Sequence, residues 1–397
     1  MANIGSDFLQ PMDSDLVVVG GGPVGCAVAA ITAKRFSTLI MEEHSDAGVP
    51  VQCAGLVTAR VIDMVGAEDS VLNRITGMVL HFPGGAELRL DGNETKAVVV
   101  DRYKFDQFCK QRAMATGARY VTGARYMDCI VKKDRITIRA DGQKDVDCRL
   151  LVGADGYKSS VSKRAGLPPP RDMVKGMACD VDHRMAEQSH VHVYLGNKIA
   201  PGFFAWKIPC GDFTRVGLCV SEKKGPPSAY LKTLMEAEHL DSSKRLATYS
   251  GVIPLGTRVK TYAERVMITG DAAAMAKPLS GGGLFTGIIS AQCAAATALE
   301  ALEKDDLSDR SLSGYQRRWK ESIGRELDRG YRVRKVFVRL NDKKLDAAGK
   351  LISKPDVMAI LQSGDIDRPT ELAPAVLRSV PSLLRFSPQI LGSLLFK

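Results

Sequence analysis

The sequence lacks any CxxC pair and any cluster of cysteine and histidine with the spacing of zinc ligands. These absences exclude the common zinc modules, and they favour the reducing cytoplasm over an oxidising compartment. His190 and His192 alternate with valines in "HVHVYLG", which is typical of one face of a strand rather than of a metal site. We therefore expect no bound metal.

Long apolar runs and an N-terminal signal pattern are also missing, since no run approaches the ~18 apolar residues of a membrane-spanning helix. We expect a cytoplasmic protein that is soluble or peripheral on the inner face of the cell membrane. The formal charge of +10 is uneven, because residues 310–344 hold twelve Lys or Arg and four Asp or Glu. This basic segment and the apolar tail after it could lie on an anionic lipid surface; the alternative is a solvated helical face.

A nucleic-acid partner is not expected, although basic segments attract phosphates of any kind. No DNA- or RNA-binding motif is present, and residues 310–344 lack the regular aromatic interleaving of a base-stacking surface. Internal repeats are absent as well.

The chain opens with a strand–turn–helix–strand unit. "DLVVVG" (15–20) predicts a buried strand, "CAVAAITAKRF" (26–36) a helix, and "STLIMEE" (37–43) a second strand. A hairpin is predicted over 78–90 and a helix over 101–120, and four strand-like segments between 176 and 221 predict an antiparallel sheet. "RVMITG" (265–270) and a long alanine-rich helix then return to the first domain, and the chain from about 306 is helical.

The first turn carries a dinucleotide-binding pattern. Gly20, Gly22 and Gly25 give GxGxxG between a strand and a helix, where the glycines allow a tight turn, close approach of a pyrophosphate and helix–strand packing. Glu42 ends the second strand, where its carboxylate can accept both ribose hydroxyls.

Two later segments favour FAD over a nicotinamide. "GADG" (153–156) and "TGDAAAMAKPLSGGG" (269–283) each place an Asp-Gly or Gly-Asp step at a strand end. Asp271 could bind a ribityl or ribose hydroxyl, and the helix that begins near Gly283 would direct its positive end at the flavin ring. The alternative is that both are ordinary turns.

Together these segments resemble the flavoprotein fold of p-hydroxybenzoate hydroxylase, and within it the geranylgeranyl reductase family, notably its archaeal digeranylgeranylglycerophospholipid reductases. Besides the glycine turn, the resemblance rests on "PVQCAGL" (50–56), "DRYKFD" (101–106), "GADG", "PGFFAWKIP" (201–209), "GDAAAMAKPLSGGG" (270–283) and "SGDIDRP" (363–369). The sequence departs from the family pattern at Phe204, Ile208, Ala54, Gly55 and Ala274.

The resemblance implies an α/β fold with an FAD-binding Rossmann-like domain, an antiparallel-sheet substrate domain and a C-terminal helical region. The predicted limits are 14–75, 98–170 and 264–305 for the first, 76–97 and 171–263 for the second, and 306–397 for the third. The cofactor-binding residues so implied are Gly20, Gly22, Gly25, Glu42, Cys53, Ala54, Arg102, Asp155, Gly156, Asp271, Gly282 and Gly283.

The implied activity is FAD-dependent reduction of isolated C=C bonds in geranylgeranyl chains of archaeal-type membrane phospholipids. Phe203, Phe204 and Trp206 lie together on a predicted strand and could line an apolar slot for a prenyl chain, with Phe204 and Trp206 as substrate-binding residues; a sheet core is the other interpretation. No second GxGxxG is evident, so the electron donor, whether a ferredoxin, a deazaflavin or a nicotinamide, stays open.

Three other functions fit the same fold: a flavin-dependent aromatic hydroxylase, a reduced-flavin isomerase or cyclase, and a non-catalytic prenyl-binding protein. The cysteine loop favours reduction, and the complete set of Gly20, Gly22, Gly25, Glu42 and Asp271 disfavours a carrier.

Cys53 is the candidate catalytic residue, although most buried cysteines are inert. Hydride addition to an isolated alkene needs a proton delivered to the neighbouring carbon, and a thiol can supply it. We expect Val49, Val51 and Leu56 to keep water from this thiol.

Overall fold

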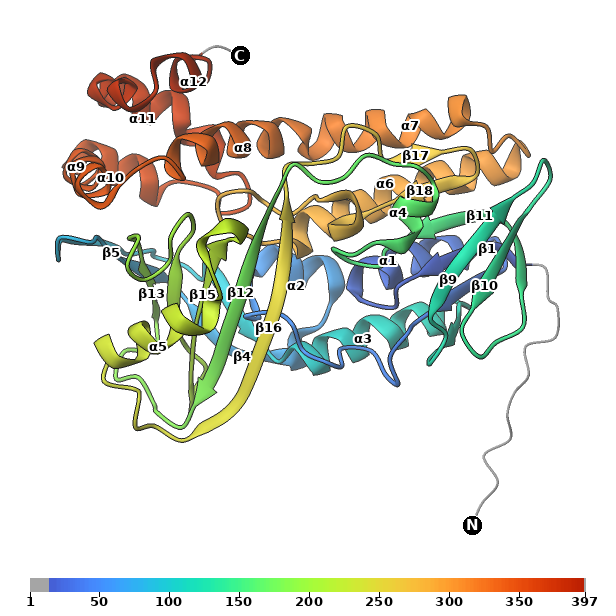
Figure 1. The fold of residues 1–397 in the computed structure, drawn as a ribbon, viewed down its shortest axis with the longest axis horizontal. Helices are drawn as coiled ribbons and strands as arrows, with labels where there is room; N and C mark the ends of the chain where they lie inside the picture. Colours follow the sequence, from blue (N-terminus) through green and yellow to red (C-terminus); the bar gives the residue numbers. More distant parts are fainter. Residues whose placement is uncertain (1–13, 396–397) are drawn as a thin grey trace.

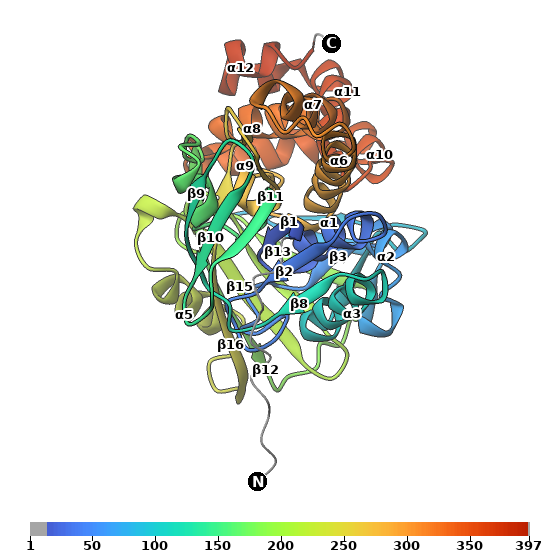
Figure 2. The ribbon, with the colours of Figure 1, turned by 90° about the vertical axis from the view of Figure 1, so that its right-hand side faces the viewer.

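The computed structural model describes residues 14–395. Figure 1 shows two large β-sheets at opposite ends of the body, with long helices along one side and a group of short helices at the C-terminal end. A view turned by 90° places these helices in a layer over the first sheet (Figure 2).

The first sheet has eight strands. Its spatial order is β17 (Tyr262–Ala263), β18 (Val266–Ile268), β11 (Val146–Gly153), β1 (Ser14–Val19), β2 (Thr38–Met41) and β8 (Arg119–Val121), with β10 (Ile136–Ala140) paired to β11 and β9 (Tyr126–Val131) paired to β10. β1 pairs in parallel with both β2 and β11. The predicted βαβ opening is confirmed, because helix α1 (Pro23–Thr32) connects β1 to β2.

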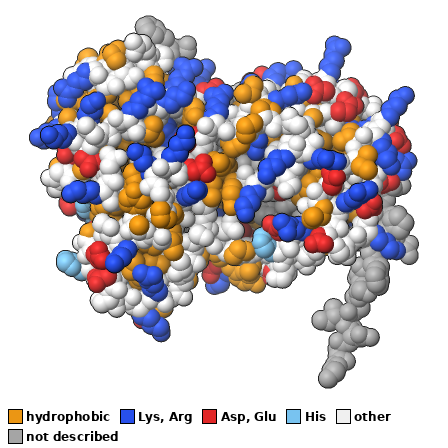
Figure 3. Space-filling model, viewed as in Figure 1, with side chains coloured by type: hydrophobic (Ala, Val, Ile, Leu, Met, Phe, Trp, Pro, Cys, Tyr) orange, Lys and Arg blue, Asp and Glu red, His pale blue; other side chains and the backbone are white. Residues whose placement is uncertain are grey.

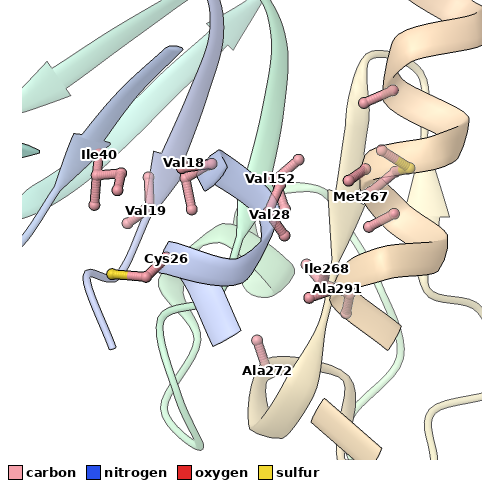
Figure 4. Close-up of a cluster of buried hydrophobic side chains, with 14 of the residues drawn as sticks. Val18, Val19, Cys26, Val28, Ile40, Val152, Met267, Ile268, Ala272 and Ala291 are labelled. Carbon is pink, nitrogen blue, oxygen red and sulfur yellow. The ribbon is translucent and has the colours of Figure 1, made fainter. Parts of the chain in front are cut away.

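Small side chains let two helices approach this sheet and each other. Helix α1 contacts the long helix α6 (Leu284–Glu303), and in α6 the residues Ala291, Ala294, Ala295 and Ala298 are fully buried. Figure 4 shows Val28 of α1 and Ala291 of α6 within the cluster that also holds Val18 and Met267. By length and composition α6 could cross a membrane, contrary to the expectation that no such run exists, but most of it is buried as a core helix.

The second sheet has seven strands. Its order is β16 (Arg245–Leu255), β12 (Asp172–Val181), β15 (Thr214–Ser221), β14 (Ala205–Pro209), β13 (His190–Tyr194), β5 (Gly77–His81) and β6 (Glu87–Leu90). The predicted hairpin is β5–β6, and the predicted helix over 101–120 is α3 (Arg102–Ala115). The sheet is antiparallel except where β13 pairs in parallel with β5, a strand that arrives more than a hundred residues earlier in the chain.

The two faces of the second sheet differ. One face packs Cys179, Val181, Val216 and Leu218 against helix α5 (Pro227–Ala237). The opposite face lies toward the loop at Cys53 and carries Trp206 and three glycines, Gly176, Gly217 and Gly251. A small third sheet of β3 (Leu56–Thr58), β7 (Ala97–Val100) and β4 (Val71–Ile75) stands beside it. The domain limits stay a prediction.

The remainder of the chain is helical, as predicted. It comprises α7 (Asp309–Trp319), a π-helical turn η4 (Lys320–Gly324), α8 (Arg325–Phe337), α9 (Asp342–Ile352), α10 (Pro355–Gln362), α11 (Ala373–Ser379) and α12 (Pro388–Gly392). Prolines stand in the first turns of α10, α11 and α12, where a missing N–H costs nothing. Several tail residues expected to face a membrane, including Leu377, Leu383 and Leu391, pack instead with Val336 and Val357 in a separate core.

Candidate cofactor and active site

Glycine is needed at the three positions of the first turn for different structural reasons. Gly20 has φ +103°, and a Cβ there would lie 2.3 Å from the carbonyl oxygen of Ala154. A Cβ on Gly25 would lie 2.0 Å from the carbonyl oxygen of Gly20. Gly22 has φ −71°, and a Cβ there would meet no atom within 4 Å. The protein itself needs Gly20 and Gly25, whereas Gly22 keeps space open at the start of α1, where a pyrophosphate would lie.

Glu42 lies beside the glycine turn. Its carboxylate accepts hydrogen bonds from the backbone N–H of Gly21 at 2.8 Å and of His44 at 2.9 Å, one on each oxygen. The ring nitrogen Nδ1 of His44 lies 2.7 Å from the oxygen that accepts from the His44 N–H, so it is the oxygen bound by Gly21 that keeps a further acceptor site for a hydroxyl. The hydroxyl of Tyr120 donates to the carbonyl oxygen of Gly21 at 2.9 Å, a support that no sequence motif indicated.

Asp155 and Gly156 follow β11, and a Cβ on Gly20 of the glycine turn would lie 3.0 Å from Cα of Asp155. The Asp155 carboxylate accepts hydrogen bonds from the Ser159 hydroxyl at 2.7 Å and the Val161 N–H at 3.1 Å. It therefore organises the start of the short helix α4 (Ser160–Arg164), which leaves the backbone of this loop to face a cofactor. The cofactor contacts of Asp155 and Gly156 stay a prediction.

Asp271 is a half-buried carboxylate without a hydrogen-bond donor among residues 14–395. A Cβ on Gly283 would lie 3.1 Å from its Oδ1, and Gly282 precedes it at the start of α6. Burial raises the pKa of Asp271 to about 6, and Arg102 acts in the opposite direction. The free N-terminus of α6, which no side chain caps, opens on the same place. A ligand with hydroxyl groups and a negative charge would satisfy both.

Ala274 has the left-handed backbone conformation, with φ +57°. The sequence places alanine here where the related pattern has glycine, and the conformation explains that preference.

Arg102 connects the cofactor side to Cys53. Its guanidinium binds the Asp106 carboxylate at 2.9 and 3.1 Å. Burial by itself lowers the pKa of Arg102, but Asp106 and the contacting sulfur of Cys53 raise it well above the ordinary value. The structure thus brings Cys53 and Arg102 together, and the charge of Arg102 lowers the pKa of Asp271.

The surroundings of Cys53 are less apolar than expected. Its sulfur is half-buried and accepts a hydrogen bond from the N–H of Gly55 at 3.4 Å. The guanidinium of Arg102 contacts the sulfur, and Val49 is 42% exposed, so Val49 does not shield the thiol from water. The expectation that Val49 keeps water from the thiol was therefore wrong, whereas Val51 and Leu56 are half-buried.

The aromatic residues separate into core and lining. Phe203 is 2% exposed and stacks on Phe204 with ring centroids 4.5 Å apart, whereas Phe204 and Trp206 are half-buried. Phe203 and Phe204 precede β14 rather than lie on it. Trp206 lies over Gly217, and it packs with Ala54 and Leu56 from the Cys53 loop. Its indole N–H has no acceptor within residues 14–395.

Sequence reasoning missed a buried ion pair behind the cofactor loop. Lys277 Nζ and Asp367 Oδ1 are 2.9 Å apart, and both residues are nearly inaccessible to solvent. The Thr58 hydroxyl donates to Asp367 at 2.8 Å. Asp367 belongs to the quoted segment "SGDIDRP", but its role needed the tertiary structure. Within the described chain no group of three or more metal-ligating side chains converges.

Known proteins share this sequence pattern and this fold. The FAD binding domain family matches residues 13–325. Digeranylgeranylglycerophospholipid reductase 1 of Methanococcoides burtonii is 30% identical over 86% of this chain and 88% of its own. Digeranylgeranylglycerophospholipid reductase 2 of Methanopyrus kandleri is 28% identical over 96% of this chain and 100% of its own. A geranylgeranyl bacteriochlorophyll reductase-like structure from Thermoplasma acidophilum has a TM-score of 0.86 at 23% identity, covering 95% of this chain and 99% of that one.

The fold, the open glycine turn and the unpartnered Asp271 define an FAD-dependent oxidoreductase with the p-hydroxybenzoate hydroxylase type of fold. Within the FAD binding domain family, the chain belongs to the geranylgeranyl reductases.

Proposed function

We propose that this flavoprotein reduces isolated C=C bonds in the geranylgeranyl chains of archaeal-type membrane phospholipids. The observation that carries the proposal is the position of the Cys53 loop against Arg102: the N–H of Gly55 donates to the Cys53 sulfur at 3.4 Å, and a Cβ on Gly55 would lie 3.6 Å from Cγ of Arg102, whose guanidinium interacts with that sulfur. The names of the relatives support the lipid substrate.

Saturating an alkene adds a hydride to one carbon and a proton to the other. FAD, once reduced, supplies the hydride. Cys53 would carry the proton on Sγ and give it to the second alkene carbon, and the cationic guanidinium of Arg102 lies beside this sulfur. The half-exposed sulfur regains a proton from water.

The apolar chain would lie beside the Cys53 loop, along the aromatic side chains at the edge of the second sheet. Ala54, Leu56 and Trp206 form one apolar cluster there, and Phe204 packs on Trp206 with ring centroids 6.1 Å apart. Aromatic and aliphatic walls suit a hydrocarbon chain because they bury it without leaving polar groups unpaired.

The electron donor and the membrane belong to the same proposal. A ferredoxin, a deazaflavin or a nicotinamide would return two electrons to the flavin after each turnover. The enzyme would work in the cytoplasm, at the inner face of the cell membrane that holds its substrate.

Dithionite-reduced protein incubated with digeranylgeranylglyceryl phosphate tests the proposal. Mass spectrometry of the lipid should show two added hydrogen atoms for each saturated bond. An unchanged lipid mass, together with oxygen-dependent oxidation of a reduced nicotinamide cofactor in the presence of phenols, would instead indicate an aromatic hydroxylase.

A further inference from the structure

Two buried ionic side chains and a half-buried tyrosine lie together on the face of the second sheet that is turned to the Cys53 loop. Arg215 is 4% exposed and Asp180 is 5% exposed. The guanidinium of Arg215 donates from Nε and one terminal nitrogen to the two carboxylate oxygens of Asp180, at 2.7 and 2.9 Å. The hydroxyl of Tyr249 donates to Asp180 Oδ2 at 2.6 Å. The carboxylate is thus held by three donors.

The strand register brings these residues to one face. Asp180 of β12 stands opposite Arg215 of β15, and Tyr249 of β16 is paired with Ala178, two residues before Asp180. Opposite and diagonal neighbours in a sheet point the same way, so the three side chains meet. Their face is opposite to the one that packs on α5.

Arg215 has one nitrogen left, and it reaches the Cys53 loop. Its NH1 donates to the carbonyl oxygen of Ala54 at 2.9 Å. Gly55 has φ +67°, and a Cβ there would lie 2.8 Å from this nitrogen. Gly251 of β16 leaves room for the carbonyl of Gln52, which would lie 3.2 Å from a Cβ. The loop therefore lies flat on the sheet.

The hydrogen bond from Arg215 is what holds the backbone of residues 50–54 to the rest of the described structure. Among the described residues, no other hydrogen bond from outside the stretch reaches the backbone of residues 50–54. Gly55 is anchored separately, since its carbonyl accepts a hydrogen bond from the N–H of Val100 at 2.7 Å. Loss of the Arg215 bond would free the segment that carries Cys53.

We propose that Asp180, Arg215 and Tyr249 form a clamp that fixes the Cys53 loop and keeps the sulfur against Arg102. They are positioning residues, and their effect on catalysis rests on the function proposed above. The carboxylate of Asp180 holds the guanidinium in one orientation, so its third donor points at the Ala54 carbonyl without further ordering. A proton donor displaced by about 1 Å loses much of its rate advantage.

Arg215→Lys in the FAD-loaded protein is the test. Lysine keeps a charge beside Asp180 but cannot serve both Asp180 and Ala54 as the planar fork does. We expect FAD content to be retained, alkylation of Cys53 by iodoacetamide to become several-fold faster, and kcat for lipid reduction to fall about 10-fold to 100-fold with little change in KM. Tyr249→Phe should shift both readouts the same way and by less.

Two controls make the alkylation specific. Cys293 is the other cysteine of the described chain that is not buried, so its alkylation rate in the same sample is the internal reference. Lys207→Arg changes the ion pair with Glu238 on the opposite face of the sheet and should leave Cys53 unaffected. Alkylation and kcat both unchanged in Arg215→Lys and Tyr249→Phe would overturn the clamp.

The test of the clamp and the test of the proposed function can fail independently of each other. Should Cys53→Ala reduce lipid at the wild-type rate, the proton donor is wrong, yet faster alkylation of Cys53 in Arg215→Lys would still establish the clamp.

Discussion

At the scale of single residues, the chemistry of this site comes from the neighbours of two side chains. In an apolar loop Cys53 would have no charged neighbour, but here the cationic guanidinium of Arg102 lies beside its sulfur. Asp271 lacks a hydrogen-bond donor within residues 14–395, and burial raises its pKa. Both environments suit a ligand with hydroxyl groups and a reaction that moves a proton.

Cys53→Ala should retain FAD and still accept electrons, while alkene reduction falls about 100-fold or more, because a positioned acid typically contributes that much. Flavin absorbance, anaerobic reduction by dithionite and product mass spectrometry check the three parts. Cys293→Ala is the matched control and should behave like the wild type. Wild-type reduction by Cys53→Ala would make Cys53 an inert packing residue.

Asp271 gives a pH prediction for the FAD-free protein. Its folded pKa of about 6 lies above the ordinary 3.8, so the folded state holds this proton more tightly and loses stability from this group as pH rises from about 4 to about 6. The free energy of unfolding of Asp271→Asn should therefore rise relative to that of the wild type across that window, by on the order of 1–3 kcal/mol. Thermal unfolding against pH measures this.

The same Asp271→Asn variant should bind FAD more weakly, because a neutral amide replaces a charged acceptor. A stability difference between variant and wild type that does not change with pH would show that burial leaves the pKa of this carboxyl at its ordinary value.

At the scale of elements, the strand–turn–helix unit separates structural from functional glycines. Gly25 is fixed by contact with the Gly20 carbonyl, whereas Gly22 borders open space. The two positions have the same residue type, but a Cβ at Gly25 would meet the backbone, whereas a Cβ at Gly22 would meet no atom within 4 Å.

Gly22→Val should therefore give a folded protein without FAD, since the added methyl groups would occupy the place of the pyrophosphate. Gly25→Val should lower the thermal midpoint, because its Cβ must displace backbone 2.0 Å away. Circular dichroism and flavin content distinguish the two. Retention of flavin by Gly22→Val, even when combined with Glu42→Ala, would place the cofactor elsewhere.

At the scale of the whole molecule, the C-terminal segment is tied to the cofactor loop. Lys277 precedes the glycines of that loop, Asp367 lies near the C-terminus, and Thr58 follows the Cys53 loop. One carboxylate thus joins three distant parts of the chain.

Asp367→Ala should destabilise the protein by about 3–5 kcal/mol, because it leaves Lys277 charged and buried without its partner. Arg60, which is 47% exposed and bonds Asp365 and Asp367 at the rim, offers the control: Arg60→Ala should cost less than about 1 kcal/mol. Chemical denaturation compares the two. Equal effects of both substitutions would show that burial of the pair is unimportant.

Membrane association is predicted to depend on charge rather than on the tail. Figure 3 shows many Lys and Arg side chains on the C-terminal lobe. Exposed basic residues of the segment 310–344 include Arg332, Lys335, Arg339, Lys343 and Lys344, whereas Arg334 is buried against Asp172.

Changing those five exposed residues to Glu should abolish sedimentation with anionic liposomes. Added salt should weaken the binding of the wild-type protein to the same liposomes. Lys132→Glu with Lys133→Glu, in the turn between β9 and β10, is the control. Undiminished binding of the five-fold variant would assign the basic surface to another partner.

The sequence by itself determined the first βαβ unit, the glycine turn, α3, α6 and the helical C-terminal region, because period-two and period-3.6 patterns and glycine positions are local properties of the chain. The tertiary structure decided the rest. It paired β13 with β5 in parallel, buried tail leucines in a core of their own, placed Arg102 on Cys53, and joined Arg215 to Ala54, 161 residues apart, and Lys277 to Asp367, 90 residues apart. Such contacts depend on which faces meet when the sheets and helices pack, and no local pattern encodes that.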